Sequence, residues 1–162
     1  MEKGDIVPEF QLPDQNGTTV SSGDLRGSWL VLYFYPKDST SGCTREALDF
    51  SALKGEFQEE GCRIVGVSPD PVESHARFAE KNGLGITLLS DTEKALLKEA
   101  GAWGTKRNYG REYEGVTRTT ILADPSGQVR EIWRSVKVRR KTKTCEILHA
   151  RTVLERLREL KG

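Results

Sequence analysis

Hydrophobic residues gather in short runs with two different spacings, and this predicts alternating strands and helices. The run from Trp29 to Tyr35 is apolar throughout and ends at Pro36, which is typical of a strand covered on both faces. From Thr44 to Glu60, apolar residues recur every third or fourth position, and Gly61 ends the run. This second spacing predicts one amphipathic helix that follows the buried strand.

The other segments are interpreted in the same way. Further strands are predicted at Phe10–Leu12, Thr18–Val20, Arg63–Ser68, Ile86–Leu89, Thr119–Ala123 and Gln128–Trp133, and further helices from Pro71 to Asn82, from the cap Asp91-Thr92 to Gly101 and from His149 to Leu160. The turn at residues 14–17 joins the first two strands into an N-terminal hairpin. This order of elements indicates a thioredoxin-like α/β fold, with a central mixed sheet flanked by helices.

Length and composition fit one soluble globular domain over residues 1–162. The chain is 36% hydrophobic and 30% charged, and 25 basic residues nearly balance 24 acidic ones. Such a balance argues against a nucleic-acid binder, which usually carries a basic excess. We expect no membrane association either, because the longest apolar run is too short to span a bilayer. The start of the chain has no signal-peptide pattern, so a cytoplasmic location is expected.

Three cysteines, Cys43, Cys62 and Cys145, are too few and too scattered for a disulfide framework. Cys43 stands in the segment that joins the buried strand to the following helix. With Thr40 as the N-cap, Cys43 falls in the first helical turn, where free N–H groups and the helix dipole stabilise a thiolate. This placement predicts a nucleophilic cysteine, and a sulfur sealed in the interior would argue against it.

The residues around Cys43 suit attack on an O–O bond. The Thr40 hydroxyl is placed to bind a peroxide oxygen and, we expect, to meet the Cys43 backbone N–H. Pro36 has no N–H, so it can wall the pocket without adding a competing donor. A stabilised thiolate, a positioned oxygen and stabilisation of the leaving oxyanion are what this reaction requires.

The spacing of Pro36, Thr40 and Cys43 matches Pro-x-x-x-Thr-x-x-Cys, and here the chain resembles the peroxiredoxins. The surrounding residues are similar to the bacterioferritin comigratory protein, or peroxiredoxin Q, branch. The matching strings are Tyr33-Phe34-Tyr35-Pro36-Lys37-Asp38, Gly42-Cys43-Thr44, Glu46-Ala47, Gly66-Val67-Ser68, Ser90-Asp91, Trp103-Gly104, Tyr109-Gly110-Arg111 and Gly115-Val116-Thr117-Arg118-Thr119-Thr120. They follow the family's order over nearly the whole chain.

The resemblance implies roles for two more residues and a reaction cycle. Arg118 corresponds to the family's active-site arginine, which would stabilise the thiolate and orient the peroxide. Glu46 corresponds to the carboxylate that holds this arginine. The implied activity is reduction of hydrogen peroxide and alkyl hydroperoxides through a sulfenic acid on Cys43, which thioredoxin or a similar thiol would recycle.

The chain departs from this pattern at two positions. Many members of the branch carry a resolving cysteine five residues after the first, where this chain has Leu48. The local two-cysteine mechanism is therefore excluded. Ser41 replaces the proline that usually precedes Gly-Cys, which predicts a less rigid helix start.

Two other cysteines could resolve the sulfenic acid. Cys62 would lie about 30 Å away along a continuous helix, at about 1.5 Å per residue, so we expect it to be structural. Cys145 follows a basic run in a stretch of about residues 139–148 that looks like an insertion before the last helix. We expect this stretch to be a flexible, solvated loop. Either Cys145 resolves Cys43, within or between chains, or an external thiol does so in a one-cysteine mode.

Other chemistries find less support in the sequence. His75 and His149 lack metal-ligand spacing to any cysteine, so no metal is expected, and no glycine-rich loop follows a strand to bind a nucleotide cofactor. A thiol–disulfide oxidoreductase would want Cys-x-x-Cys, but residue 46 is Glu. A redox sensor or holdase using Cys43 stays open as the alternative function. We expect a monomer or a weak dimer.

Overall fold

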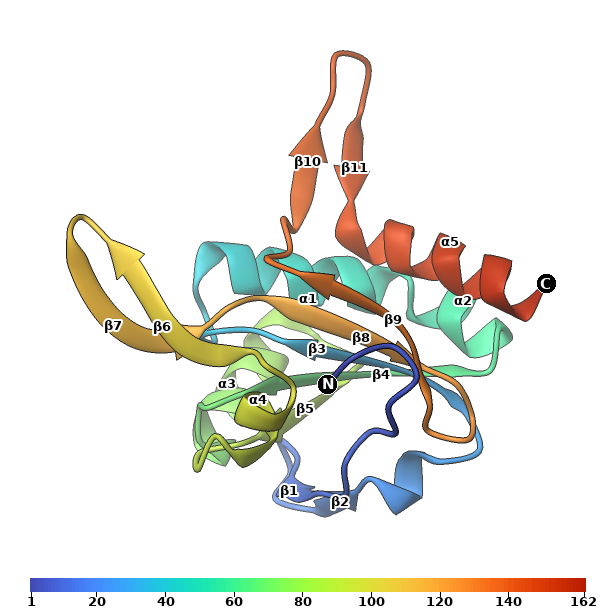
Figure 1. The fold of residues 1–162 in the computed structure, drawn as a ribbon, viewed down its shortest axis with the longest axis horizontal. Coiled ribbons are helices and arrows are strands. Elements are labelled where there is room, and N and C mark those ends of the chain that lie inside the picture. Colours follow the sequence, from blue (N-terminus) through green and yellow to red (C-terminus); the bar gives the residue numbers. More distant parts are fainter.

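The fold is built on a five-stranded mixed sheet (Figure 1). The computed structural model describes the backbone of residues 1–162 and every side chain except that of Asn108. The strand order is β5-β4-β3-β8-β9, with β3 at Trp29–Phe34, β4 at Cys62–Ser68, β5 at Thr87–Ser90, β8 at Thr119–Ala123 and β9 at Val129–Arg134. Strand β3 is parallel to β4 and antiparallel to β8, as expected for a thioredoxin-like fold.

Strand β3 is central because both of its faces are apolar. Val31 and Tyr33 point into one buried cluster, while Leu32 and Phe34 point into the other. This alternation follows from the two-residue period of a strand, and a strand buried on both faces needs apolar residues at every position. The predicted strand from Trp29 to Tyr35 is thus confirmed, although β3 itself ends at Phe34.

Five helices surround the sheet, and Figure 1 shows α1, α2 and α5 along one side of it. Their bounds are α1 Ser41–Ala52, α2 Lys54–Glu59, α3 Val72–Asn82, α4 Ala95–Glu99 and α5 His149–Lys161, and a 3-10 turn spans Gly23–Leu25. Helices α1, α2, α3 and α5 contribute to the cluster that contains Tyr33. Helix α4 packs in the other cluster with residues of the N-terminal segment.

Three hairpins lie outside the central sheet. They are β1–β2 (Gln11–Pro13 and Thr19–Ser21), β6–β7 (Trp103–Asn108 and Arg111–Val116) and β10–β11 (Arg139–Lys141 and Glu146–Leu148). The N-terminal hairpin confirms the predicted one, shifted by one residue. The other two project from the body of the molecule (Figure 1).

Two predicted helices need correction. The segment from Thr44 to Glu60 is not one helix, because Leu53 leaves helical geometry with φ −96° and ψ 2° and separates α1 from α2. The helix assigned to the cap Asp91-Thr92 begins only at Ala95, after Lys94 in a left-handed conformation. The Asp91 carboxylate still accepts a hydrogen bond from the Leu97 N–H at 2.8 Å, so it serves the helix from outside the cap position.

The segment around residues 139–148 also differs from its prediction. Instead of a flexible loop it forms an antiparallel hairpin, in which Arg140 pairs with Ile147. Arg139 anchors the hairpin to α1 through Asp49, with Nη2 2.6 Å from Oδ1. Its position as an insertion stays a prediction. None of the helices in the part of the chain just described is long and apolar enough to cross a membrane.

Candidate active site

Cys43 lies in the first turn of α1, directly after the segment that leaves the central strand. Thr40 is the N-cap residue, with extended backbone angles, as the sequence predicts. The first N–H groups of a helix have no intrahelical acceptors, and the side chain of the N-cap residue Thr40 does not cap them. The Cys43 sulfur therefore lies near unsatisfied donors and the positive end of the helix dipole.

Arg118 approaches Cys43 from the antiparallel strand. It immediately precedes β8, whose first residue Thr119 pairs with Phe34 at the end of β3. The main-chain oxygen of Arg118 accepts a hydrogen bond from the Val136 N–H at 3.0 Å. At the other end of its side chain, Arg118 Nη2 donates to the Cys43 Sγ at 3.1 Å. The register of two strands thus brings residues 75 positions apart into contact.

Glu46 holds the same guanidinium from the opposite side. Its Oε1 accepts a hydrogen bond from Arg118 Nη1 at 3.0 Å. Glu46 follows Cys43 by three residues, so both side chains lie on one face of α1. Burial raises the pKa of the Glu46 carboxyl to about 7, and the charge of Arg118 opposes this rise. The positive charge of Arg118 therefore favours the ionised form of the buried Glu46 carboxyl group.

Gly42 makes room for this arrangement. A Cβ atom at residue 42 would lie 2.8 Å from Arg118 Nη2, which is too close for any side chain to be accommodated without movement of the guanidinium. The glycine before the cysteine is therefore required by the approach of Arg118 rather than by its own backbone angles.

The Cys43 side chain is more deeply buried than its place at a helix terminus suggests. Its residue is only 1% exposed. The Arg118 side chain that covers the sulfur is 20% exposed, and Thr40 is exposed beside it. The sulfur is thus buried beside a cation whose side chain is partly exposed, and it is not surrounded only by apolar groups.

The Thr40 hydroxyl departs from its predicted contact. It donates to the main-chain oxygen of Lys37 at 2.8 Å and makes no capping bond to the Cys43 N–H. The hydroxyl keeps two lone pairs that can accept a hydrogen bond from another molecule. Pro36 is half-buried. It directly follows Tyr35, whose N–H donates to the main-chain oxygen of Val67 in β4 at 3.0 Å.

The remaining cysteines lie away from this group of residues. Cys62 is the first residue of β4 and pairs with Trp29, at the opposite end of β3 from Cys43. Cys145 is exposed near the tip of the β10–β11 hairpin, where its Sγ lies 3.4 Å from the Thr142 hydroxyl. Leu48 lies on α1 and is 42% exposed.

One buried group near Cys43 was missed by the sequence analysis. Tyr33 is fully buried, stacks on Phe50 at 4.8 Å between ring centroids, and its hydroxyl has no hydrogen-bond partner among the described residues. Burial raises its pKa well above the usual value, and the charges of Glu46 and Cys43 act in the same direction. The apolar pattern of β3 explains why Tyr33 looked like an ordinary core residue.

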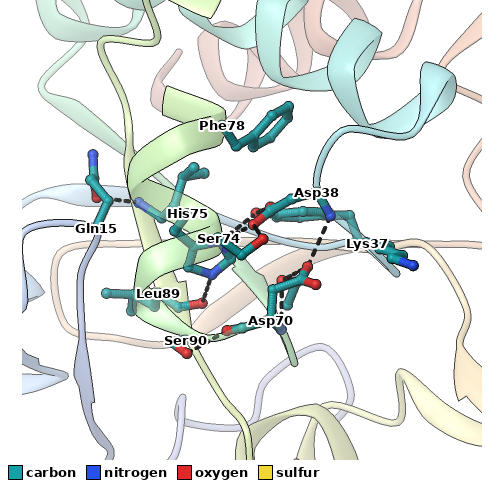
Figure 2. Close-up of polar contacts among 12 residues, drawn as sticks. Gln15, Lys37, Asp38, Asp70, Ser74, His75, Phe78, Leu89 and Ser90 are labelled. Atoms are coloured by element: carbon teal, nitrogen blue, oxygen red, sulfur yellow. Dashed lines mark hydrogen bonds and ion pairs between the residues drawn. The ribbon is translucent and has the colours of Figure 1, made fainter. Parts of the chain in front are cut away.

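The two histidines are both buried. His149 begins α5 and lies 2.9 Å from the Thr120 hydroxyl, and burial lowers its pKa to about 4. His75 of α3 lies beside Asp38 and Asp70, which come from the loops before α1 and α3, and these three residues bring one potential ligand atom each within 4.8 Å of one another. Their atoms are engaged in the hydrogen bonds drawn in Figure 2. The absence of a metal stays a prediction.

Comparison with known proteins gives one consistent result. The model of the AhpC/TSA family matches residues 3–132. The peroxiredoxin Bcp of Bacillus subtilis is 44% identical over 139 residues, covering 86% of this chain and 88% of the relative. A putative peroxiredoxin bcp of Helicobacter pylori is 39% identical over 157 residues, which cover 97% of this chain and 98% of the relative.

Solved structures agree with these relatives. The bacterioferritin comigratory protein of Xanthomonas campestris, studied for its alkyl peroxide reduction activity, superposes with a TM-score of 0.84 at 40% identity, covering 94% of this chain and 92% of that one. A PrxQ variant of Xylella fastidiosa reaches a TM-score of 0.90 at 34% identity, covering 100% and 98%. The chain therefore belongs to the AhpC/TSA family, among the peroxiredoxins of the Bcp and PrxQ group, and is a thiol-dependent peroxidase.

Proposed function

We propose that this enzyme reduces hydrogen peroxide and alkyl hydroperoxides with the thiolate of Cys43 as the nucleophile. The observation that carries the proposal is the contact between Arg118 Nη2 and the Cys43 Sγ, at 3.1 Å. A guanidinium at this distance places a fixed positive charge and an N–H donor beside the sulfur, where negative charge moves during attack on a peroxide. The B. subtilis and X. campestris relatives support this chemistry.

The first step transfers an oxygen atom from the peroxide to the sulfur. The thiolate attacks the distal peroxide oxygen, so an S–O bond forms while the O–O bond breaks. Cys43 becomes a sulfenic acid and is oxidised by two electrons, and the leaving alkoxide or hydroxide takes a proton to become alcohol or water. Arg118 faces the developing negative charge, and the Thr40 lone pairs can accept the peroxide O–H.

The second step returns the sulfur to its thiol state. A thiol condenses with the sulfenic acid, releasing water and forming a mixed disulfide, which a second thiol then cleaves. Because α1 carries Leu48 where a resolving cysteine is common, we propose a one-cysteine mode with thioredoxin or a similar external thiol as reductant. The projection of the β10–β11 hairpin away from α1 supports this choice over Cys145 of the same chain (Figure 1).

The proposal is tested by oxidising the reduced protein with one equivalent of hydrogen peroxide and trapping the products for mass spectrometry. Trypsin separates the three cysteines into peptides 38–45, 55–63 and 144–151. We expect a sulfenic acid on peptide 38–45 and release of one equivalent of water per peroxide.

Three other results would change the assignment. Oxidation confined to peptide 144–151 would remove Cys43 from the reaction. A disulfide between peptides 38–45 and 144–151 would make Cys145 the resolving residue, within or between chains. Stoichiometric oxidation of Cys43 without catalytic peroxide consumption, together with capture of a partner protein, would favour a sensor or holdase.

A further inference from the structure

A buried polar cluster connects the segment before Cys43 to helix α3. We name it the Asp38 cluster, and its members are Tyr35, Asp38, Asp70, Ser74 and His75. Asp38 lies five residues before Cys43 and is 5% exposed, and His75 is fully buried. Figure 2 shows Asp38 facing Ser74 and His75 of α3, with Asp70 on the other side of its main chain.

The carboxylate and the main-chain N–H of Asp38 are both hydrogen-bonded. Its carboxylate lies 2.6 Å from His75 Nδ1 and accepts hydrogen bonds from the Ser74 hydroxyl at 2.8 Å and the Tyr35 hydroxyl at 2.7 Å. Its main-chain N–H donates to Asp70 at 2.9 Å. The end of β3 and the segment from Asp70 to His75 therefore meet at one residue of the β3–α1 connection.

The contacts of His75 define where its protons lie. Nε2 faces the main-chain oxygen of Leu89 at 3.0 Å, and because a carbonyl oxygen can only accept, Nε2 carries a proton. Burial alone would raise the pKa of Asp38, but hydrogen bonds from His75 and Tyr35 outweigh it and lower the pKa. Nδ1 faces the Asp38 carboxyl group at 2.6 Å, so both ring nitrogens are engaged and the two residues form a buried hydrogen-bonded pair.

The segment that this pair anchors has few other buried contacts. Among residues 36–40, Asp38 is the buried residue, while Lys37, Ser39 and Thr40 are exposed. Ser39 adopts φ 63°, a left-handed conformation that persists in a non-glycine residue only where surrounding contacts hold it. Thr40 and the first turn of α1 follow directly, so their position depends on the anchor at Asp38.

We propose that the Asp38–His75 pair positions the first turn of α1 and thereby keeps the Cys43 sulfur in contact with Arg118. The inference rests on the proposed function of Cys43 and adds two positioning residues to it. Attack on a small peroxide needs the sulfur beside Arg118. Reaction with a bulky reagent needs the sulfur to leave this place, because Cys43 is 1% exposed. Weakening the Asp38–His75 pair should therefore lower the rate of peroxide reduction and raise the rate at which a bulky reagent reacts with Cys43.

The test is a double-mutant cycle with Asp38→Asn, His75→Gln and the double variant. For each protein we would measure kcat/KM for hydrogen peroxide and the rate at which a fluorescein maleimide labels Cys43, quantified on tryptic peptide 38–45. A shift of the closed-to-open ratio from about 10:1 to about 1:10 would lower the peroxide rate about tenfold and raise the labelling about tenfold, and we expect a change of this size in each single variant. The double variant should be no worse than either single, because the residues act as one pair.

Val153→Ala is the matched control for lost stability. Val153 is a fully buried residue of α5 and packs in the same hydrophobic core as Cys43. Its side chain makes no hydrogen bond to the Asp38 cluster. This variant should lower the urea midpoint without raising the labelling of Cys43. Hydrogen exchange should increase at residues 36–46 in the Asp38 and His75 variants, but not in Val153→Ala.

The proposal and the function of Cys43 fail in different ways. Additive single effects, or peroxide and labelling rates that fall together, would overturn the positioning role while leaving an active wild-type peroxidase. A wild-type protein without peroxidase activity would refute the proposed function, and the labelling and exchange measurements would still decide whether the pair holds the first turn of α1.

Discussion

Cys43 and Cys62 are buried to nearly the same extent but at opposite ends of the central sheet. The two residues are 1% and 3% exposed. Cys43 has the Arg118 guanidinium 3.1 Å from its sulfur, whereas the Cys62 thiol faces the main-chain oxygen of Arg63 at 3.6 Å. Burial raises the pKa of Cys62 to about 12. The two thiols therefore differ in the charge beside them and not in their depth in the protein.

The largest difference should appear when each cysteine is replaced by serine. We expect Cys43→Ser to reduce peroxide turnover by more than about a thousandfold, because the nucleophile is lost. Cys62→Ser should stay within about twofold of the wild type, since no reacting atom changes. Peroxide consumption with a thiol reductant measures both, and equal losses in the two variants would contradict the comparison.

Removing the positive charge of Arg118, which lies beside Cys43 but not beside Cys62, should have the next largest effect on the rate of peroxide reduction. Arg118→Ala should slow the oxidation of Cys43 about a hundredfold, as is typical when one preorganised donor is lost. Arg134→Ala is the control, because this arginine of β9 donates to main-chain oxygens of Ala100 and Met1 and does not contact Cys43. The second-order rate constant for oxidation by peroxide, measured by stopped flow, should fall in Arg118→Ala and stay unchanged in Arg134→Ala. An unchanged rate in Arg118→Ala would exclude the guanidinium from the site.

Glu46→Gln should give the smallest effect on the rate and a distinct dependence on pH. The folded pKa of Glu46, about 7, lies above its usual value of 4.5, so the carboxyl binds its proton more tightly in the folded state. Its contribution to stability is full below pH 4.5 and is lost as pH rises toward 7. We therefore expect the unfolding free energy of the wild type to fall relative to Glu46→Gln over this range.

Urea titrations at several pH values would measure this change in relative stability. The peroxide rate of Glu46→Gln should fall by about tenfold or less, because the amide oxygen can still accept from Arg118. A stability difference that is constant from pH 4.5 to 7 would show that Glu46 is not perturbed by burial.

The sequence predicts the central fold well because its strands and long helices carry clear periodic patterns. The β6–β7 hairpin was missed for a physical reason: residues 111–114 of β7 are all exposed, so no apolar alternation marks them. The break at Leu53 was missed because its side chain continues the apolar spacing of α1 while its backbone leaves the helix. Side-chain periodicity does not report such a local change in backbone angles.

The site was predictable where residues are close in the sequence or belong to a known motif. Cys43, Thr40 and Pro36 share one short segment, and the resemblance to peroxiredoxins supplied Arg118 and Glu46. The contact between Asp38 and His75 spans 37 residues and was not predicted. It arises where the parallel strands β3 and β4 end side by side, and a spacing rule along one segment cannot show it.

Gly42 illustrates how a position without reactive atoms can still limit the chemistry. A methyl group there would lie 2.8 Å from Arg118 Nη2, so the guanidinium would have to shift from its present position. Transplanting this thiol and guanidinium onto another scaffold would therefore also require a residue without a Cβ beside the guanidinium. The proposed role of Arg118 thus depends on a neighbouring residue that contributes no side-chain atom.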